Sequence, residues 1–236
     1  MATYLYCVLA PPKTEDFPTG LTGIAGAAVR AITTRAGAGL EAWVATVDES
    51  KLRASGSALA RLALLHNEVI EAALATRRTP LPTRFGSCFA DDEACLADLS
   101  AREDELFERL ERVADAIEMS VLLVPIEGAV PWPAALPRGE EPSAGRRYLE
   151  VVRERTRAAD ERRAAADALT DRVTVAVSEV ARDERRSLSK EPVAIAHLVR
   201  RADLEHYRRA LAGVNAGPSL RIVVAGPRAP YSFASD

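Results

Sequence analysis

The chain has 236 residues, of which 48% are hydrophobic and 28% are charged, and its formal net charge is −3. This length holds one large domain or two small ones, and the composition is neither that of a disordered chain nor that of a membrane protein. The slight acidic excess argues against a nucleic-acid-binding protein, which usually has a clear basic excess. No apolar run approaches the roughly 20 residues of a membrane-spanning helix, so no membrane partner is predicted.

Cysteine usage indicates a reducing compartment. Cys7, Cys88 and Cys95 are an odd set without CxxC spacing. Such a set favours free thiols over a disulfide framework. The N-terminal segment has a short apolar run without a preceding basic region, which predicts a first strand rather than a signal peptide. A cytoplasmic location is therefore expected.

Two strands are predicted near the N-terminus. Residues 4–9 (YLYCVL) form an apolar, aromatic run that two prolines stop, which suits a buried strand. Residues 13–39 are rich in Gly, Thr and Ala, and they predict a loop with a small helix around 25–32. Residues 41–47 (EAWVATV) favour a strand that pairs with the first one.

Two helices and a strand are predicted next. Apolar residues recur at helical spacing over 57–77, and a Thr-Pro step ends this helix. Residues 81–86 (LPTRFG) predict a short extended segment. A helix with an aspartate as its N-cap is predicted over 92–115, and an apolar strand over 117–124.

This element order, ββαβαβ, predicts an α+β fold. We expect an N-terminal domain over 1–124, in which a mixed or antiparallel sheet carries helices on one face as a ferredoxin-like variant. Five prolines and two glycines fall within residues 125–142, so this Pro-rich segment is the expected linker. A second domain is expected over 143–236.

The second domain is predicted to contain long helices and a small β-α-β element. Residues 143–181 lack proline and follow an apolar 3-4 repeat, which predicts one long helix or a helical hairpin that packs on its own domain. A strand over 193–199, a helix over 203–212 and a strand over 219–225 are predicted before a C-terminal tail.

Motifs that carry chemistry are weak throughout the chain. His66 lies in HNEVIE, which lacks the second histidine of an HExxH zinc site, so a packed histidine is the favoured interpretation. A pair of Cys88 with His66 is the route to a cysteine-dependent enzyme, although Cys88 more simply buries as a small hydrophobic residue. The glycine-containing segments lack a Walker lysine. We therefore predict no catalytic, cofactor-binding or metal-binding residues.

Several segments resemble one known family. They are YLYCVL, HNEVIEAAL, LPTRFGSCFADDEA, GRRYLE and the C-terminal GPRAPYSF, which occur in the family's order over nearly the whole chain. The combination of LPTRFG with GPRAPYSF at this separation is the specific part. On these residues the chain resembles the gas vesicle protein F/L family (GvpF/GvpL).

The resemblance implies an accessory or minor structural protein of gas vesicles. Such a protein would act in the cytoplasm and at the vesicle, bind the small hydrophobic shell protein GvpA and assist assembly, without catalysis or a cofactor. It also implies an α+β N-terminal domain joined to a C-terminal domain with long helices and a small sheet. An alternative is a scaffold that binds other gas vesicle accessory proteins through the helix over 143–181.

Two of these motifs supply the candidate residues for partner binding or for docking the tail on the N-terminal domain. The candidates are Arg84, Phe85, Gly86, Pro227, Pro230, Tyr231 and Phe233. Each motif also has a purely structural interpretation, as a turn beside a buried aromatic residue or as an anchor for the tail.

Overall fold

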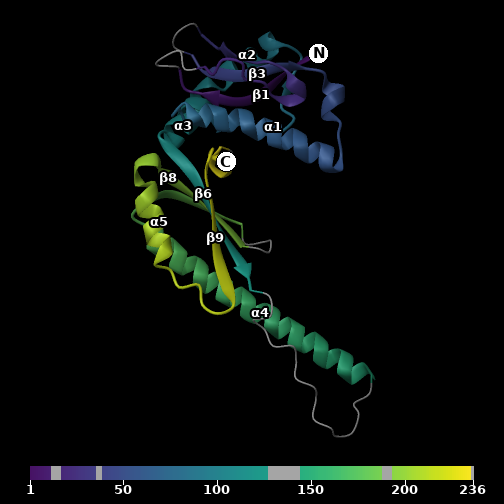
Figure 1. The fold of residues 1–236 in the computed structure, drawn as a ribbon, viewed down its shortest axis with the longest axis vertical. Helices are drawn as coiled ribbons and strands as arrows, with labels where there is room; N and C mark the ends of the chain where they lie inside the picture. Colours follow the sequence, from purple (N-terminus) through teal and green to yellow (C-terminus); the bar gives the residue numbers. More distant parts are fainter. Residues whose placement is uncertain (12–16, 36–38, 127–143, 188–192, 235–236) are drawn as a thin grey trace. The chain divides into compact units, whose positions relative to one another are not determined.

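The computed structural model describes residues 1–11, 17–35, 39–126, 144–187 and 193–234 (Figure 1). These residues form an α+β protein with two sheets, as predicted. The chain divides into two compact units, Met1–Glu118 together with Pro227–Asp236, and Met119–Gly226. Among the described residues, no helix combines the length and the apolar character needed to cross a membrane.

The first unit is built on a five-stranded sheet. Its strands are β1 (Ala2–Leu9), β2 (Val29–Thr33), β3 (Glu41–Val47), β4 (Leu81–Pro82) and β5 (Cys88–Phe89). The order is β2-β3-β1-β4, and β5 also pairs with β1. All these pairs are antiparallel, which confirms the strands predicted at 4–9 and 41–47 and their pairing.

Three helices belong to this unit: α1 (Gly56–Ala75), α2 (Asp92–Ala101) and α3 (Glu103–Val113). The helix predicted over 57–77 is confirmed as α1. The prediction of one helix over 92–115 is wrong, because the backbone at Arg102 leaves helical geometry (φ −117°, ψ 20°) and divides it. An aspartate caps α2 as expected, since the Asp91 carboxylate accepts from the backbone N–H of Ala94 at 2.8 Å.

The loop between β1 and β3 contains a strand that the sequence does not predict. The small helix expected around 25–32 is present only as a 3-10 turn over Ile24–Gly26. The residues that follow form β2, which pairs with β3 from Val29 opposite Ala45 to Thr33 opposite Glu41. Pairing with a neighbouring strand therefore outweighs the local preference of this Ala-rich segment.

A β-bulge in β1 affects which of its side chains point to each face of the sheet. The register with β3 shifts between Leu5 and Cys7, which changes the alternation of side chains between the two faces. Tyr4 and Tyr6 belong to the hydrophobic core that includes residues of α1. Thr3 points the other way, and its hydroxyl donates to a carboxylate oxygen of the first residue of α2 at 2.6 Å. Helices therefore cover both faces of β1, which corrects the expectation of helices on one face.

The second unit is built on a four-stranded sheet of order β7-β8-β6-β9. Its strands and helices are β6 (Ala116–Pro125), α4 (Ala144–Val177), β7 (Ala181–Ser187), β8 (Val193–Arg200), α5 (Leu204–Ala212) and β9 (Leu220–Arg228). This β-α-β-β-α-β order is typical of ferredoxin-like folds. In the first unit, by contrast, three strands precede the first helix. The predicted β-α-β element corresponds to β8, α5 and β9, with β6 between the two strands in the sheet.

Two strands of this sheet differ from expectation. The strand predicted at 117–124 exists as β6, but it pairs with β8 and β9 instead of closing the first sheet. The first six residues of β6 and Leu123 are buried, as expected of a central strand. The charged strand β7 is not predicted at all, because its sequence ARDERRS lacks a strand-like apolar pattern. It pairs antiparallel with β8.

The segment predicted as one long helix or a hairpin is a single helix, α4. Its C-terminal half buries a stripe at helical spacing, formed by Ala166, Leu169, Thr170, Val173 and Val177. In its N-terminal half, none of the described side chains between residues 149 and 165 is buried. The side chains of the GRRYLE motif before Leu149 lie outside the described residues. Among the described side chains of α4, the apolar stripe therefore packs on its own unit from Ala166 onward.

The limits of the two units differ from the expected limits of 1–124 and 143–236. The division falls within β6 and within β9, so the last ten residues group with the first unit. Glu118 supplies a physical reason, since its fully buried carboxylate accepts from the backbone N–H of Ser232 at 2.7 Å and from Nη2 of Arg228 at 2.6 Å. The linker expected over 125–142 lies, from residue 127 onward, outside the described residues and stays a prediction.

Candidate functional site

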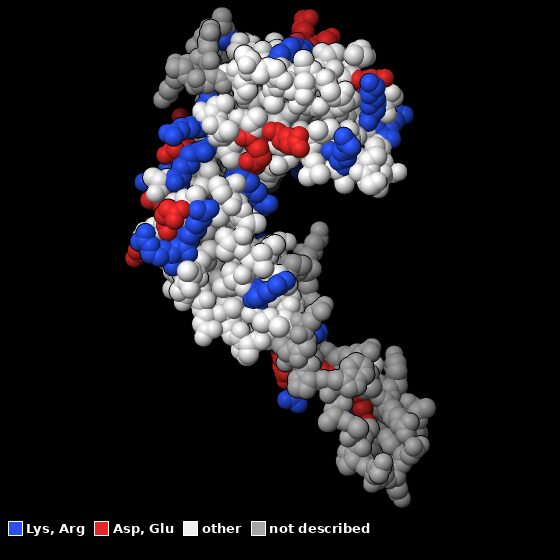
Figure 2. Space-filling model, in the orientation of Figure 1, with Lys and Arg blue, Asp and Glu red and all other residues white. Residues whose placement is uncertain are grey.

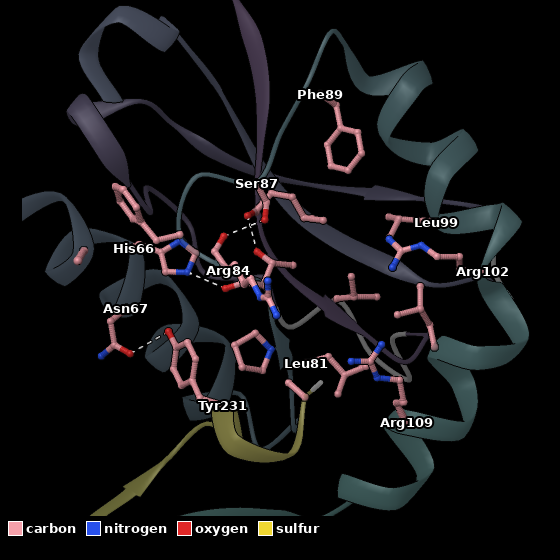
Figure 3. A pocket seen from close by; sticks show the side chains of 18 residues that line it. His66, Asn67, Leu81, Arg84, Ser87, Phe89, Leu99, Arg102, Arg109 and Tyr231 are labelled. Atoms are coloured by element: carbon pink, nitrogen blue, oxygen red, sulfur yellow. Dashed lines mark hydrogen bonds between the residues drawn. The ribbon is translucent and has the colours of Figure 1, made fainter. Parts of the chain in front are cut away.

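A pocket of about 590 Å³ lies in the first unit (Figure 3). Its walls come from β1, α1, the LPTRFG segment, helices α2 and α3, and the C-terminal tail. Its apolar lining includes Leu5, Val8, Leu81, Phe89, Leu99 and Leu106. The pocket is thus assembled from segments that lie far apart in the sequence.

The LPTRFG segment forms the centre of the pocket wall. After β4, a turn runs from Arg84 to Ser87, whose backbone N–H donates to the carbonyl oxygen of Arg84 at 3.2 Å. Gly86 has a φ of +92°, which favours glycine at the third position of a type II turn. This turn leaves Arg84 exposed and Phe85 half-buried.

Thr83 fixes the turn to the first strand. Its backbone N–H donates to the carbonyl oxygen of Tyr6 at 3.0 Å, and its hydroxyl donates to the carbonyl oxygen of Leu5 at 2.6 Å. The position of the turn beside β1 is therefore set by hydrogen bonds to the backbone as well as by packing.

A buried histidine lies behind the turn. Nε2 of His66 is 3.2 Å from the carbonyl oxygen of Thr83, which can only accept, so Nδ1 accepts from the hydroxyl of Tyr4 at 2.9 Å. The same hydroxyl oxygen accepts from the backbone N–H of Gly86 at 3.0 Å, and the ring of Phe85 lies edge-on to the histidine. Burial lowers the pKa of His66, although the bond to Thr83 opposes this shift. His66 is therefore a neutral, packed histidine that holds the turn in place.

The C-terminal tail forms another part of the wall. Tyr231 lines the pocket, and its hydroxyl donates to Oδ1 of Asn67 at 3.1 Å. Pro230 and Phe233 are buried outside the pocket lining, so they dock the tail on the first unit. Pro227 is exposed and also lies outside the lining.

The candidate residues thus fall into separate groups. Arg84, Phe85 and Tyr231 come together around one pocket, and Gly86 shapes the turn that carries two of them. The pocket also contains residues that the motifs do not include, namely Leu99, Arg102, Leu106 and Arg109. Their spacing of three, four and three residues is that of one face of the single helix predicted over 92–115, so the sequence placed them together although the structure divides this helix at Arg102. The sequence did not show which surface these residues would meet.

Three arginines, Arg84, Arg102 and Arg109, stand around the apolar lining (Figure 3). Arg102 pairs with Asp98, and Nη1 of Arg109 lies 2.6 Å from the carboxylate of Glu105. Within the described part of the chain, the guanidinium of Arg84 has no hydrogen bond or ion pair. None of the described residues that line the pocket is an aspartate or glutamate. The pocket therefore offers an apolar surface with positive charge at its rim.

The geometry does not form a thiol–imidazole pair. Both ring nitrogens of His66 engage Tyr4 and Thr83, so neither is directed at the thiol of Cys88. Burial raises the pKa of Cys88, which opposes formation of a nucleophilic thiolate. The described residues contain no group of three His, Cys, Asp or Glu side chains that could hold a metal ion. The arrangement around the pocket, an apolar surface with arginines beside it, suits binding of a partner.

Comparisons with known proteins extend over the whole chain. The family model described as gas vesicle synthesis protein GvpL/GvpF matches residues 2–235. The gas vesicle protein L of Streptomyces sp. (strain CB03234) is 31% identical, and the match covers 98% of this chain and 92% of that protein. The gas vesicle protein L2 of Halobacterium salinarum is 28% identical, with 99% of this chain and 91% of that protein covered.

Two solved structures have the same fold. The crystal structure of GvpF from Anabaena sp. PCC7120 matches with a TM-score of 0.76 at 20% identity, covering 100% of this chain and 98% of that one. The crystal structure of GvpF from Microcystis aeruginosa matches with a TM-score of 0.72 at 19% identity, covering 99% of each chain. These structures establish the fold, and the family match establishes the relationship: the chain belongs to the gas vesicle synthesis protein GvpL/GvpF family.

Proposed function

We propose that this protein binds the small hydrophobic shell protein of gas vesicles, GvpA, and assists vesicle assembly as an accessory or minor structural component. The proposal gives it a binding role in the cytoplasm and at the vesicle, without catalysis and without a cofactor. Its membership of a gas vesicle protein family supplies the cellular context.

The physical need for such a partner follows from the nature of the shell. A subunit that assembles into a hydrophobic wall must expose apolar, strand-forming surface beforehand, and such surface aggregates unless another protein covers it. A partner can cover it by offering an apolar groove or a free sheet edge.

The observation that carries the proposal is the apolar pocket of the first unit. Both segments that make the family resemblance specific, LPTRFG and the C-terminal tail, contribute to its wall. Ala63, Arg84 and Arg102 are exposed at this pocket, so a partner can reach it. A protein surface with an apolar centre and a polar rim is typical of interaction sites.

Co-purification tests the proposal. The full chain, carrying an affinity tag, is co-expressed with GvpA in cells that make gas vesicles, and the eluate is probed for GvpA before and after chemical crosslinking. We expect GvpA to co-purify in a crosslinkable complex. Absence of GvpA from the eluate under both conditions would contradict the proposal.

A second candidate function is a scaffold that binds other gas vesicle accessory proteins through α4. One observation favours it: Leu149 and Val152, one helical turn apart, are 55% and 38% exposed on the half of α4 that buries none of its described side chains. The double variant Leu149→Asp with Val152→Asp separates the two functions, because neither position is buried. If α4 is the scaffold, this variant loses accessory proteins and keeps GvpA.

A further inference from the structure

We propose that the pocket of the first unit receives a short segment of the shell protein in which an apolar side chain lies next to a carboxylate, and that Arg84 pairs with this carboxylate. The inference rests on the proposed function and specifies the chemistry of its binding site. It commits to a polypeptide segment as the occupant.

The apolar part of the site has room for a large side chain. The volume of about 590 Å³ lies within the range of about 300–1,000 Å³ typical of ligand-sized pockets. Leu81 and Leu99 in its lining are buried, and Phe89 is half-buried (Figure 3). An apolar side chain entering here would lose contact with water on most of its surface, which is the usual source of affinity at such an anchor.

The apolar surface continues beyond the pocket along α1. Ala63 and His66 line the pocket, and Leu59 precedes Ala63 by four residues, so all three lie on one side of the helix. Leu59 is 39% exposed. The apolar surface is therefore longer than one side chain, which fits a segment of polypeptide better than a single small molecule.

The charge at the rim selects for an acidic segment. Arg102 and Arg109 already pair with carboxylates four residues before them, Asp98 and Glu105. Arg84 is exposed at the turn and has no such partner among the described residues. An arginine binds a carboxylate through two parallel hydrogen bonds, so Arg84, whose guanidinium is not paired with a described residue, is the best placed of the three arginines to recognise one.

A matched pair of charge reversals tests the inference. Arg84→Glu changes the rim of this pocket, and Arg221→Glu changes an exposed arginine that lines a groove of the second unit. Both positions are exposed, so neither change should affect folding, which circular dichroism and thermal unfolding verify. Tagged full-length variants are co-expressed with GvpA. The amount of GvpA that each variant retains is then quantified at NaCl concentrations between roughly 50 and 500 mM, because rising salt increasingly screens charge pairs.

We expect Arg84→Glu to reduce retained GvpA by at least about tenfold and Arg221→Glu to change it by less than about twofold. Retention by the unchanged protein should fall as salt rises. If Arg84→Glu retains as much GvpA as the unchanged protein, the inference is overturned while the proposed function stands. If the unchanged protein retains no GvpA at any salt concentration, the proposed function itself fails.

Two further results decide between occupants. A GvpA variant with its acidic residues replaced one at a time by lysine should include one that binds Arg84→Glu better than the unchanged protein. Native mass spectrometry of the protein purified without GvpA should show the bare chain mass. A bound fatty acid, lost in Arg84→Glu, would assign the pocket to a lipid carboxylate and overturn the inference.

Discussion

Two apolar grooves of similar size lie among the described residues, one in each unit. The pocket of the first unit measures about 590 Å³, and a groove of the second unit, between β9 and the C-terminal end of α5, measures about 540 Å³. Arginines and no acidic residues occur among the described lining residues of both. In the view of Figure 2, charged side chains of the second unit gather over α5, and the surface around β9 carries few. Volume and apolar character alone therefore do not distinguish them.

The two grooves differ in how the chain builds them. The first collects residues from Leu5 to Ala234, whereas the second comes almost entirely from residues 208–226, with Met119 as the exception. The first includes the motif residues Arg84 and Tyr231. A site assembled from distant segments depends on the whole unit being folded, and residues of LPTRFG and of the C-terminal tail meet at that site.

The largest effect is expected where the tail is held. Glu118→Ala removes a fully buried carboxylate that accepts from Arg228 and Ser232. Loss of charge-assisted, buried hydrogen bonds should lower the free energy of unfolding by about 2–3 kcal/mol. Chemical denaturation measures this loss, and limited proteolysis should cut the tail of the variant faster.

A surface ion pair provides the control for that change. Arg157 and Glu161 pair at 2.9 Å on α4, with 82% and 66% of their side chains exposed. Arg157→Ala should change the free energy of unfolding by no more than about 0.5 kcal/mol. Equal losses in the Glu118 and Arg157 variants would contradict the role given to Glu118.

Substitutions that fill each groove with a large side chain test directly which groove binds GvpA. Ala63 on α1 and Ala212 on α5 are exposed helical alanines that line the first and second groove, respectively. Ala63→Trp should weaken GvpA binding by about tenfold, or about 1.4 kcal/mol, because the indole occupies the space of the partner. Ala212→Trp should leave binding unchanged. A co-purification assay compares the two, and the reverse outcome would move the binding site to the second unit.

Two glycines near the grooves, Gly86 and Gly213, differ in whether their backbone angles require glycine. Gly86 has a φ of +92°, whereas Gly213 has φ −80° and ψ −9°, which any residue can adopt. Gly86→Ala should lower the free energy of unfolding by about 1 kcal/mol through backbone strain, since open space surrounds the added methyl group. Gly213→Ala should be neutral or stabilise by up to about 1 kcal/mol. Denaturation curves that rank the two variants the other way would argue against the turn geometry.

The smallest effect concerns pH and the buried histidine of each unit. Burial lowers the pKa of His66 and of His197; for His197, the nearby Glu184 opposes the shift. In the unfolded chain these histidines bind protons near their ordinary pKa of 6.5, whereas in the folded protein they bind protons only at lower pH. Stability is therefore complete above about pH 6.5 and declines as pH falls through the folded-state pKa values. Protonated His66 would also lose its bond from Tyr4.

Denaturation between about pH 7.5 and about pH 5 measures this decline. His66→Gln should make the free energy of unfolding depend less on pH, because it removes the contribution of His66. His197→Gln should have a smaller effect, because Glu184 opposes the lowering of the His197 pKa. Identical pH curves for the unchanged protein and His66→Gln would show that this histidine does not titrate as described.

Sequence patterns predicted the elements that depend on local periodicity. The strand at 41–47 follows from its strand-favouring residues, and helix α1 follows from helical spacing of its apolar residues. The break at Arg102 escaped prediction, because arginine is a good helix former and apolar spacing continues from Leu99 to Leu106 across it. Strand β7 escaped because its pairing with β8 stabilises it in place of an apolar face.

The pocket could be predicted only in part. The two motifs that carry the family resemblance supplied Arg84, Phe85 and Tyr231 as candidates. Their proximity depends on contacts such as Tyr231 with Asn67, which are 164 residues apart. No local pattern records contacts of this separation, and a single sequence does not reveal which surfaces meet.

Photo-crosslinking from inside each groove tests the central claim most directly. A benzophenone amino acid replaces Phe89, half-buried in the first pocket, or Val224, 43% exposed in the second groove, in the full chain co-expressed with GvpA. The account predicts a crosslinked band with GvpA from position 89 and none from position 224. Crosslinks from position 224 alone, or from neither position in cells that build vesicles, would contradict it.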